Sequence, residues 1–167
     1  MAYIEWEFSG VWITPTDVAE VSPTYPTALP LRYANSTTTF DGVALCLENI
    51  TLDAGNTVVM RECAAGNGFE SAMVVDRLIK VTGNPEMKKI ATQDRYLQLI
   101  SMSEAILTWG LDGPTTAVMT VSAPKAQIVK NTEGDRNGIV TDELEFQCNQ
   151  NASTIDTECT ITFTAAV

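Results

Sequence analysis

The chain of 167 residues contains no histidine. Histidine is the usual general base near neutral pH, the partner of serine and cysteine nucleophiles, and the commonest zinc ligand. Its absence excludes most catalytic systems that depend on an activated nucleophile. Carboxylate pairs of the glycosidase kind remain available, but the acids of this chain alternate along predicted strands, as expected for a sheet surface. We therefore predict no catalytic residues, no cofactor and no enzyme.

Basic residues are scarce, and long apolar runs are missing. Ten lysines and arginines stand against 21 acids, for a net charge of −11. The basic residues are scattered, whereas a sequence-specific nucleic-acid reader presents them in clusters that displace counterions from phosphate. No apolar run approaches the length that spans a bilayer, and the first residues lack a charged leader. We expect a chain made and kept in the cytoplasm, with no membrane partner.

The cysteines lack the spacing of a metal or redox site. None forms the C-x-x-C pair typical of zinc and thioredoxin-like sites. In a cytoplasm such thiols stay reduced and are mostly buried, so we predict core residues and no metal ligands. The four are Cys46, Cys63, Cys148 and Cys159.

One acidic segment is similar to a calcium-binding loop. When Gly138 is aligned with the invariant glycine, Glu133, Asp135 and Asn137 occupy the first ligand positions. Leu144 then falls where the bidentate glutamate must be. A turn with solvated charges is the better interpretation.

The clearest pattern that is present has a period of two, as in a β-strand with one buried face. Near the N-terminus, Ile4, Trp6 and Phe8 alternate with Glu5, Glu7 and Ser9. Two later runs alternate in the same way, and the polar segment 149–154 joins them, so we predict a closing antiparallel hairpin. The apolar positions of these two runs are Leu144, Phe146 and Cys148, and then Cys159, Ile161 and Phe163.

Further strands and one helix are predicted between these ends. The strands lie at residues 44–52, 57–62, 69–81, 105–109 and 116–122, separated by Gly and Asn turns. Residues 92–102 favour a helix because Tyr96, Leu97 and Ile100 share one face, and Asp94 suits its positive end. Trp6 and Trp109 fall on apolar strand faces and are expected in the core.

Residues 14–39 contain four prolines among serines, threonines and tyrosines, a pattern that fits neither a core strand nor a helix. We predict a Pro-rich arm or long loop within a single domain that covers residues 1–167. Aromatic side chains on such an arm are candidate anchors on a neighbouring subunit. The arm residues concerned are Pro23, Tyr25, Pro26 and Tyr33.

The order of several phrases resembles the tail-tube (major tail) proteins of long-tailed bacteriophages over nearly the whole chain. The specificity lies in their order and spacing, since each phrase alone is common. They are Phe8-Ser9-Gly10-Val11, Ser22-Pro23-Thr24-Tyr25-Pro26, Leu52-Asp53-Ala54-Gly55-Asn56-Thr57-Val58, Val75-Asp76-Arg77, Ala123-Pro124-Lys125-Ala126-Gln127 and Asp135-Arg136-Asn137-Gly138-Ile139.

The resemblance implies a mainly β fold, an antiparallel sandwich or barrel-like tube fold with one flanking helix. It also implies a virion protein, assembled in the host cytoplasm, whose strands combine in rings that are usually six-fold. The rings stack into a tube through which double-stranded DNA leaves the capsid, and other tail proteins are the remaining partners. Loops and an arm reach from ring to ring.

An acidic lining would repel DNA phosphates and let the genome slide. By strand parity, the candidate lumen-facing acids are Glu5, Glu7, Glu143 and Glu145. Two points stay open. The chain is either a whole subunit or the C-terminal tube domain of a larger one, which leaves the ring symmetry undetermined. The alternative function is a β-sandwich module of a viral assembly that binds a receptor or carbohydrate through its aromatic residues.

Overall fold

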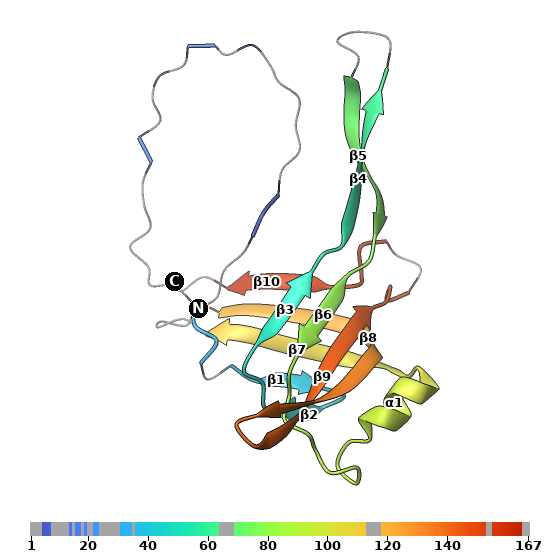
Figure 1. The fold of residues 1–167 in the computed structure, drawn as a ribbon. Helices are drawn as coiled ribbons and strands as arrows, with labels where there is room; N and C mark the ends of the chain where they lie inside the picture. Colours follow the sequence, from blue (N-terminus) through green and yellow to red (C-terminus); the bar gives the residue numbers. More distant parts are fainter. Residues whose placement is uncertain are drawn as a thin grey trace.

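The computed structural model describes residues 5–7, 14, 16–17, 19, 22–23, 31–34, 36–63, 69–112, 118–152 and 155–164. Ten strands and one helix follow each other in these ranges (Figure 1). The elements are β1 (Thr38–Phe40), β2 (Val43–Leu45), β3 (Ile50–Asp53), β4 (Asn56–Glu62), β5 (Phe69–Arg77), β6 (Lys80–Gly83), α1 (Arg95–Ser101), β7 (Glu104–Asp112), β8 (Val118–Arg136), β9 (Ile139–Cys148) and β10 (Thr160–Thr164).

Eight of the strands form one antiparallel sheet in the order β2-β1-β7-β8-β9-β6-β3, with β10 paired to β8. The long strand β8 joins two halves of this sheet. Its first part pairs with β7 and β10, and its second part pairs with β9. A register shift lies between Ile128 and Lys130, where bulges commonly bend a strand. The two halves therefore run in different directions, as Figure 1 shows.

The core lies between the two halves of the bent sheet. Phe40 of β1 contacts Phe146 of β9 with ring centroids 4.9 Å apart, although β7 and β8 separate these strands in the sheet. The mainly antiparallel β fold with one short helix is thus confirmed. The buried apolar residues are Phe40, Leu45, Val81, Leu107, Trp109, Val121, Ala123, Ala126, Ile128, Leu144, Phe146 and Cys148.

The predicted closing hairpin is wrong. β9 pairs with β8 and β6, whereas β10 pairs with β8 through Thr160 opposite Ser122. Both strands are antiparallel to β8 and lie one after the other along it, since Cys148 pairs opposite Ala126. The chain leaves β8 after Cys148 and rejoins it at Thr160. A period of two identifies strands but does not choose their partners.

Three further expectations about burial are wrong. Trp6 is 71% exposed, and Glu5 to Glu7 form no strand. Cys46 is exposed, and only Cys148 of the four cysteines is buried. Ile161 and Phe163 of β10 are also exposed. Trp109, in contrast, is buried as predicted.

Strand boundaries differ from the predicted ones where the chain bends. The predicted strand 69–81 is divided at Leu78 into β5 and β6, and 44–52 is divided into β2 and β3. β8 runs on to Arg136, where Asn137 and Gly138 turn the chain with φ of 55° and 84°. Two successive residues with positive φ are typical of a tight hairpin turn, so the predicted turn is confirmed at Asn137 and Gly138, whereas Glu133 and Asp135 lie in β8.

Candidate assembly surfaces

The outer face of the β8, β9, β6 and β3 half is polar at most of its paired positions, and Ile139, which pairs with Arg136 at the start of β9, is an apolar exception. In β9 and β6 the apolar residues Leu144, Phe146 and Val81 point into the core, so their neighbours point outward. Thr82 pairs with Glu145, and Thr132 pairs with Glu143, which places them on this outward side. We call this surface the polar face. Its residues are Thr51, Asp53, Lys80, Thr82, Lys130, Thr132, Glu143, Glu145 and Gln147.

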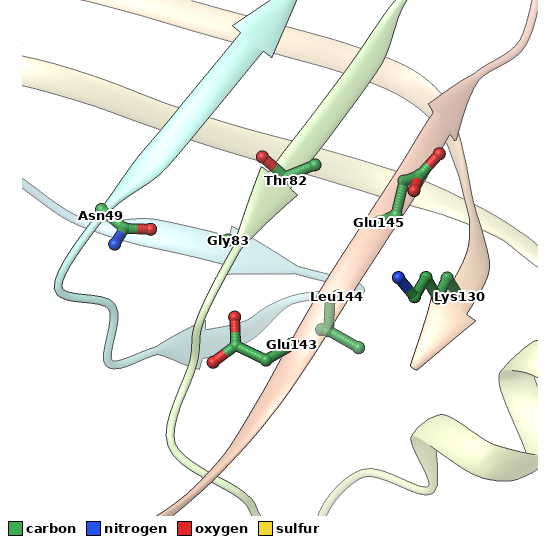
Figure 2. A pocket seen from close by; sticks show the side chains of 7 residues that line it. All are labelled: Asn49, Thr82, Gly83, Lys130, Glu143, Leu144 and Glu145. Carbon is green, nitrogen blue, oxygen red and sulfur yellow. The ribbon is translucent and has the colours of Figure 1, made fainter. Parts of the chain in front are cut away.

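Charges of both signs lie on the polar face. Lys80 Nζ donates a hydrogen bond to Glu145 Oε1 at 2.7 Å, and Thr141 Oγ1 lies 3.4 Å from Glu143 Oε1. Figure 2 shows Glu143, Glu145 and Lys130 on adjacent strands around a shallow hollow. Three carboxylates and two ammonium groups give the face a small negative charge. It is therefore more neutral than the overall charge of −11 suggests.

The other predicted site residues lie apart from the polar face. Glu5 and Glu7 are exposed and belong to no strand, and Pro23 is also exposed. Tyr33 is half-buried, and its hydroxyl lies 3.1 Å from Thr38 Oγ1 of its own chain. The last part of the predicted arm is folded, since β1 begins at Thr38. Tyr25 and Pro26 lie outside the described residues.

β4 and β5 form a separate two-stranded ribbon that projects from the body of the molecule (Figure 1). Val58 pairs with Val74, and the next pair is Val59 with Met73. Successive residues of a strand point to opposite faces, so both faces of the ribbon carry apolar side chains. All four are exposed, Val74 to 54%. Both strands were predicted from the sequence, but their separation from the sheet was not.

The base of the ribbon is held at Gly55 and Arg77. Gly55 has a φ of +56°, and a Cβ there would lie 2.1 Å from the Leu78 carbonyl oxygen. Arg77 forms ion pairs with Asp156 at 2.6 Å and Glu158 at 2.7 Å, and the hydrogen bond to Asp156 raises the pKa of Arg77. These contacts tie the ribbon to the segment before β10.

Helix α1 attaches to the sheet through Arg95, with further contacts from Tyr96 to Glu133 of β8 and from Leu99 to the core. Asp94 caps the helix by accepting a hydrogen bond from the Leu97 amide at 2.8 Å, as its position predicted. Arg95 forms a buried ion pair with Asp142 of β9. The predicted apolar face does not pack on the core, because Leu97 and Ile100 are exposed, Ile100 to 78%. The predicted orientation of the helix is therefore wrong.

The described residues include carboxylates and thiols, the side chains that could ligate a metal. No group of three metal-ligating side chains occurs among them. Burial raises the pKa of Cys148 to about 12, and also raises that of Cys159, so neither thiol ionises readily at neutral pH. None of the described helices is long and apolar enough to cross a bilayer.

Comparison with known proteins finds the same fold among solved structures. No family model and no curated protein matches the chain. The anti-feeding prophage cap, a tube-terminating cap, matches with a TM-score of 0.61 and 13% identity, over 85% of this chain and 97% of the cap. The PVC sheath/tube terminator of an extracellular contractile injection system matches with a TM-score of 0.60 and 13% identity, over 84% and 100%.

A chain of the PVC sheath-tube complex matches in the same way, with a TM-score of 0.59 and 13% identity. The match covers 81% of this chain and 93% of that one. The protein therefore shares its fold with components of contractile injection systems.

Proposed function

We propose that this protein is a structural subunit that self-assembles into rings of a phage tail or tail-like particle. The rings either stack as the tube or terminate it. The shared fold supports this proposal, since two of the similar structures are a tube-terminating cap and a sheath/tube terminator. The particle is assembled in the host cytoplasm from copies of this chain and other tail proteins.

The β4 and β5 ribbon is the observation that carries the proposal. An isolated two-stranded ribbon is marginally stable in water, and this one exposes apolar side chains on both faces. Full burial of a valine side chain stabilises by roughly 1.5–3 kcal/mol. A second copy that covers one face of the ribbon would bury Val58 and Val74 together. We assign the ribbon to the contact between copies.

The polar face is the surface we assign to the lumen. The residues that define it are all polar, so it suits contact with water, and its small negative charge disfavours tight binding of phosphate. Glu143 and Glu145 would then line the channel beside Lys80 and Lys130. Double-stranded DNA passes such a wall without specific binding.

The alternative, a module that binds a receptor or carbohydrate through aromatic residues, has less support. Of its two proposed tyrosines, Tyr33 is half-buried and its hydroxyl is within hydrogen-bond distance of Thr38. The pocket-lining residues around Thr108 and Thr120 are mostly small and polar, with Trp109 itself in the core.

Negative-stain microscopy of the purified chain over a concentration series tests the proposal. We expect rings with a central hole, which either stack or remain single. Replacing Val58 and Val74 by serine should prevent ring formation or stacking. Replacing Ile90, a still more exposed aliphatic residue outside the ribbon, by serine should not. Monomers at every concentration would contradict the proposal.

A further inference from the structure

The outward side of α1 carries exposed apolar residues. Arg95 is buried and Leu99 packs partly on the core, so their side of the helix faces the sheet. Leu97 and Ile100, three residues apart, share another side and are 60% and 78% exposed. Met102, directly after the helix, is 70% exposed. We call Leu97, Ile100 and Met102 the helix patch.

Two lysines lie close to the start of α1. Lys88 and Lys89 precede the turn at residues 90–92 that leads into the helix. Neither lysine forms an ion pair with a described residue. The acids on either side of them in the chain are already engaged, since Glu86 pairs with Arg136 and Asp94 caps α1. This end of the helix therefore attracts carboxylates, although the chain as a whole is acidic.

The ribbon of β4 and β5 has an apolar face that matches the helix patch. Val58 and Val74 pair with each other and so share this face, where they are 50% and 54% exposed. Met60 pairs with Ala72 further along the same face. The seven residues of β4 extend over roughly 23 Å. The seven residues of α1 extend over only about 10 Å, so the ribbon is long enough to cover the helix patch.

The charges of the ribbon complement the two lysines. Arg61 pairs with Glu70, and Arg77 forms its ion pairs at the base of the ribbon. Glu62 and Asp76 form no ion pair with a described residue. The ribbon thus carries unpaired carboxylates beside its apolar side chains, and the region of α1 carries unpaired ammonium groups beside its own.

The ribbon and α1 lie at different ends of the molecule. Figure 1 shows the ribbon projecting from one end of the body, with α1 toward the opposite end. Only another copy can therefore bring the two surfaces together. A contact between two different surfaces repeats from copy to copy and builds rings or stacks. A contact of one surface with itself about a two-fold axis would close at two copies.

We propose that the Val58 and Val74 face of the ribbon packs on the helix patch of a neighbouring copy. This contact covers exposed apolar residues of both copies at once. It also brings the carboxylates of the ribbon toward Lys88 and Lys89, which steers the association and fixes which surfaces meet. The inference rests on the proposed self-assembly and names the surface that receives the ribbon.

Strand β10 is the competing apolar surface. Ile161 and Phe163 are 45% and 66% exposed on the side of the sheet that holds the core. The charged residues that precede β10 in the chain are Asp156 and Glu158, which would not attract the carboxylates of the ribbon. Charge therefore favours the helix patch over β10.

Disulfide crosslinking tests which surface receives the ribbon. All variants carry Cys46→Ser and Cys63→Ser, because these two native thiols are exposed and half-buried. One preparation carries Val74→Cys with a mass tag, and the second carries Ile100→Cys. The two are mixed, assembled and oxidised with oxidised glutathione. We expect a mixed dimer on a non-reducing gel that dithiothreitol dissolves.

The matched controls place the second cysteine on other exposed surfaces. Thr82→Cys lies on the polar face, and Phe163→Cys lies on β10. Neither should form a mixed dimer with Val74→Cys. Crosslinking through Phe163→Cys that equals or exceeds crosslinking through Ile100→Cys would overturn the inference.

A double-mutant cycle gives a second readout without added cysteines. Val74→Ala and Ile100→Ala should each raise the concentration needed for assembly about tenfold, since each truncates an apolar contact. The double variant should raise it by much less than about a hundredfold, because both changes weaken the same contact. A loss in the double variant equal to the product of the single losses would place the two residues in separate contacts.

The outcomes separate this inference from the proposed function. Assemblies without the crosslink to Ile100→Cys, or with independent effects in the cycle, would overturn the inference alone. A chain that forms no assembly at any concentration would overturn both proposals.

Discussion

Arg95 at the start of α1 and Asp142 in β9 form an ion pair in which both side chains are only 3% exposed. Two neighbours complete the arrangement. Arg95 Nη1 donates to the Glu86 carbonyl oxygen at 3.3 Å, and Gln93 Nε2 donates to the Phe40 carbonyl oxygen at 3.2 Å. The helix is thus anchored by a buried charge, while Leu97 and Ile100 face outward and Leu99 packs partly on the core.

Replacing Asp142 by alanine should strongly destabilise the fold. Removal of one partner leaves an uncompensated charge in the interior, which typically costs about 3–5 kcal/mol. The matched control, Glu70→Ala, breaks the exposed pair of Arg61 and Glu70 and should cost less than about 1 kcal/mol. Urea unfolding measures both. Equal losses for the two variants would contradict the anchoring role.

Replacing Gly55 by alanine should disturb the base of the ribbon. Gly42 is the matched control, since its φ of +74° also disfavours alanine but no atom lies within 4 Å of a Cβ there. The strain of a positive φ costs about 1–2 kcal/mol at either position. At Gly55 the clash with Leu78 adds roughly 1–3 kcal/mol. Thermal unfolding would detect this difference, and identical melting temperatures would exclude the clash.

The burial of alternate strand residues could be predicted from the sequence where the two halves of the sheet pack against each other. Leu144, Phe146 and Cys148 alternate with polar residues and are buried, because β1 lies opposite β9 across the core. The same alternation in β10 gave a wrong burial prediction for Ile161 and Phe163. β10 lies at a part of the sheet that the other half does not cover. No local sequence pattern predicts where that covering half ends.

The periodicity of the sequence could not predict how helix α1 is oriented or that β4 and β5 form a separate ribbon, for related reasons. Arg95 is buried only because Asp142 lies 47 positions later in the chain and reaches the same point in space. In the ribbon, the adjacent apolar pairs Val58 with Val59 and Val74 with Val75 were the available signal. A strand with apolar residues on both faces needs cover on both sides. That pattern indicates a contact with another copy or a fully buried strand, and it does not distinguish them.

Charge reversal on the polar face should change how assembled rings treat DNA. Rings carrying Glu143→Lys and Glu145→Lys should form normally, since both positions lie on the surface, but should retain double-stranded DNA. The retention should weaken steeply with salt, because lysines at phosphates release counterions. Rings with Glu143→Gln and Glu145→Gln are the control and should retain much less. Equal retention of DNA by these two preparations would show that this face does not line the lumen.

Thiol labelling should separate Cys46 from Cys148. Cys46 is exposed, whereas burial raises the pKa of Cys148 to about 12. At pH 8 only about one Cys148 in ten thousand would be a thiolate, so its labelling should require unfolding. Because this pKa is raised in the folded state, the associated stability is full below about pH 9 and is lost as the pH rises toward 12. Mass spectrometry after a labelling pulse measures both rates. Fast labelling of native Cys148 would contradict the buried position.

Averaged electron cryomicroscopy images of the assembled chain test the central claim most directly. We predict a ring with an open central hole, walled by β8, β9, β6 and β3, with Glu143 and Glu145 facing the hole. The β4 and β5 ribbon should lie against a neighbouring copy. An assembly without a hole, or a hole walled by α1 while the polar face lies on the outside, would contradict the account.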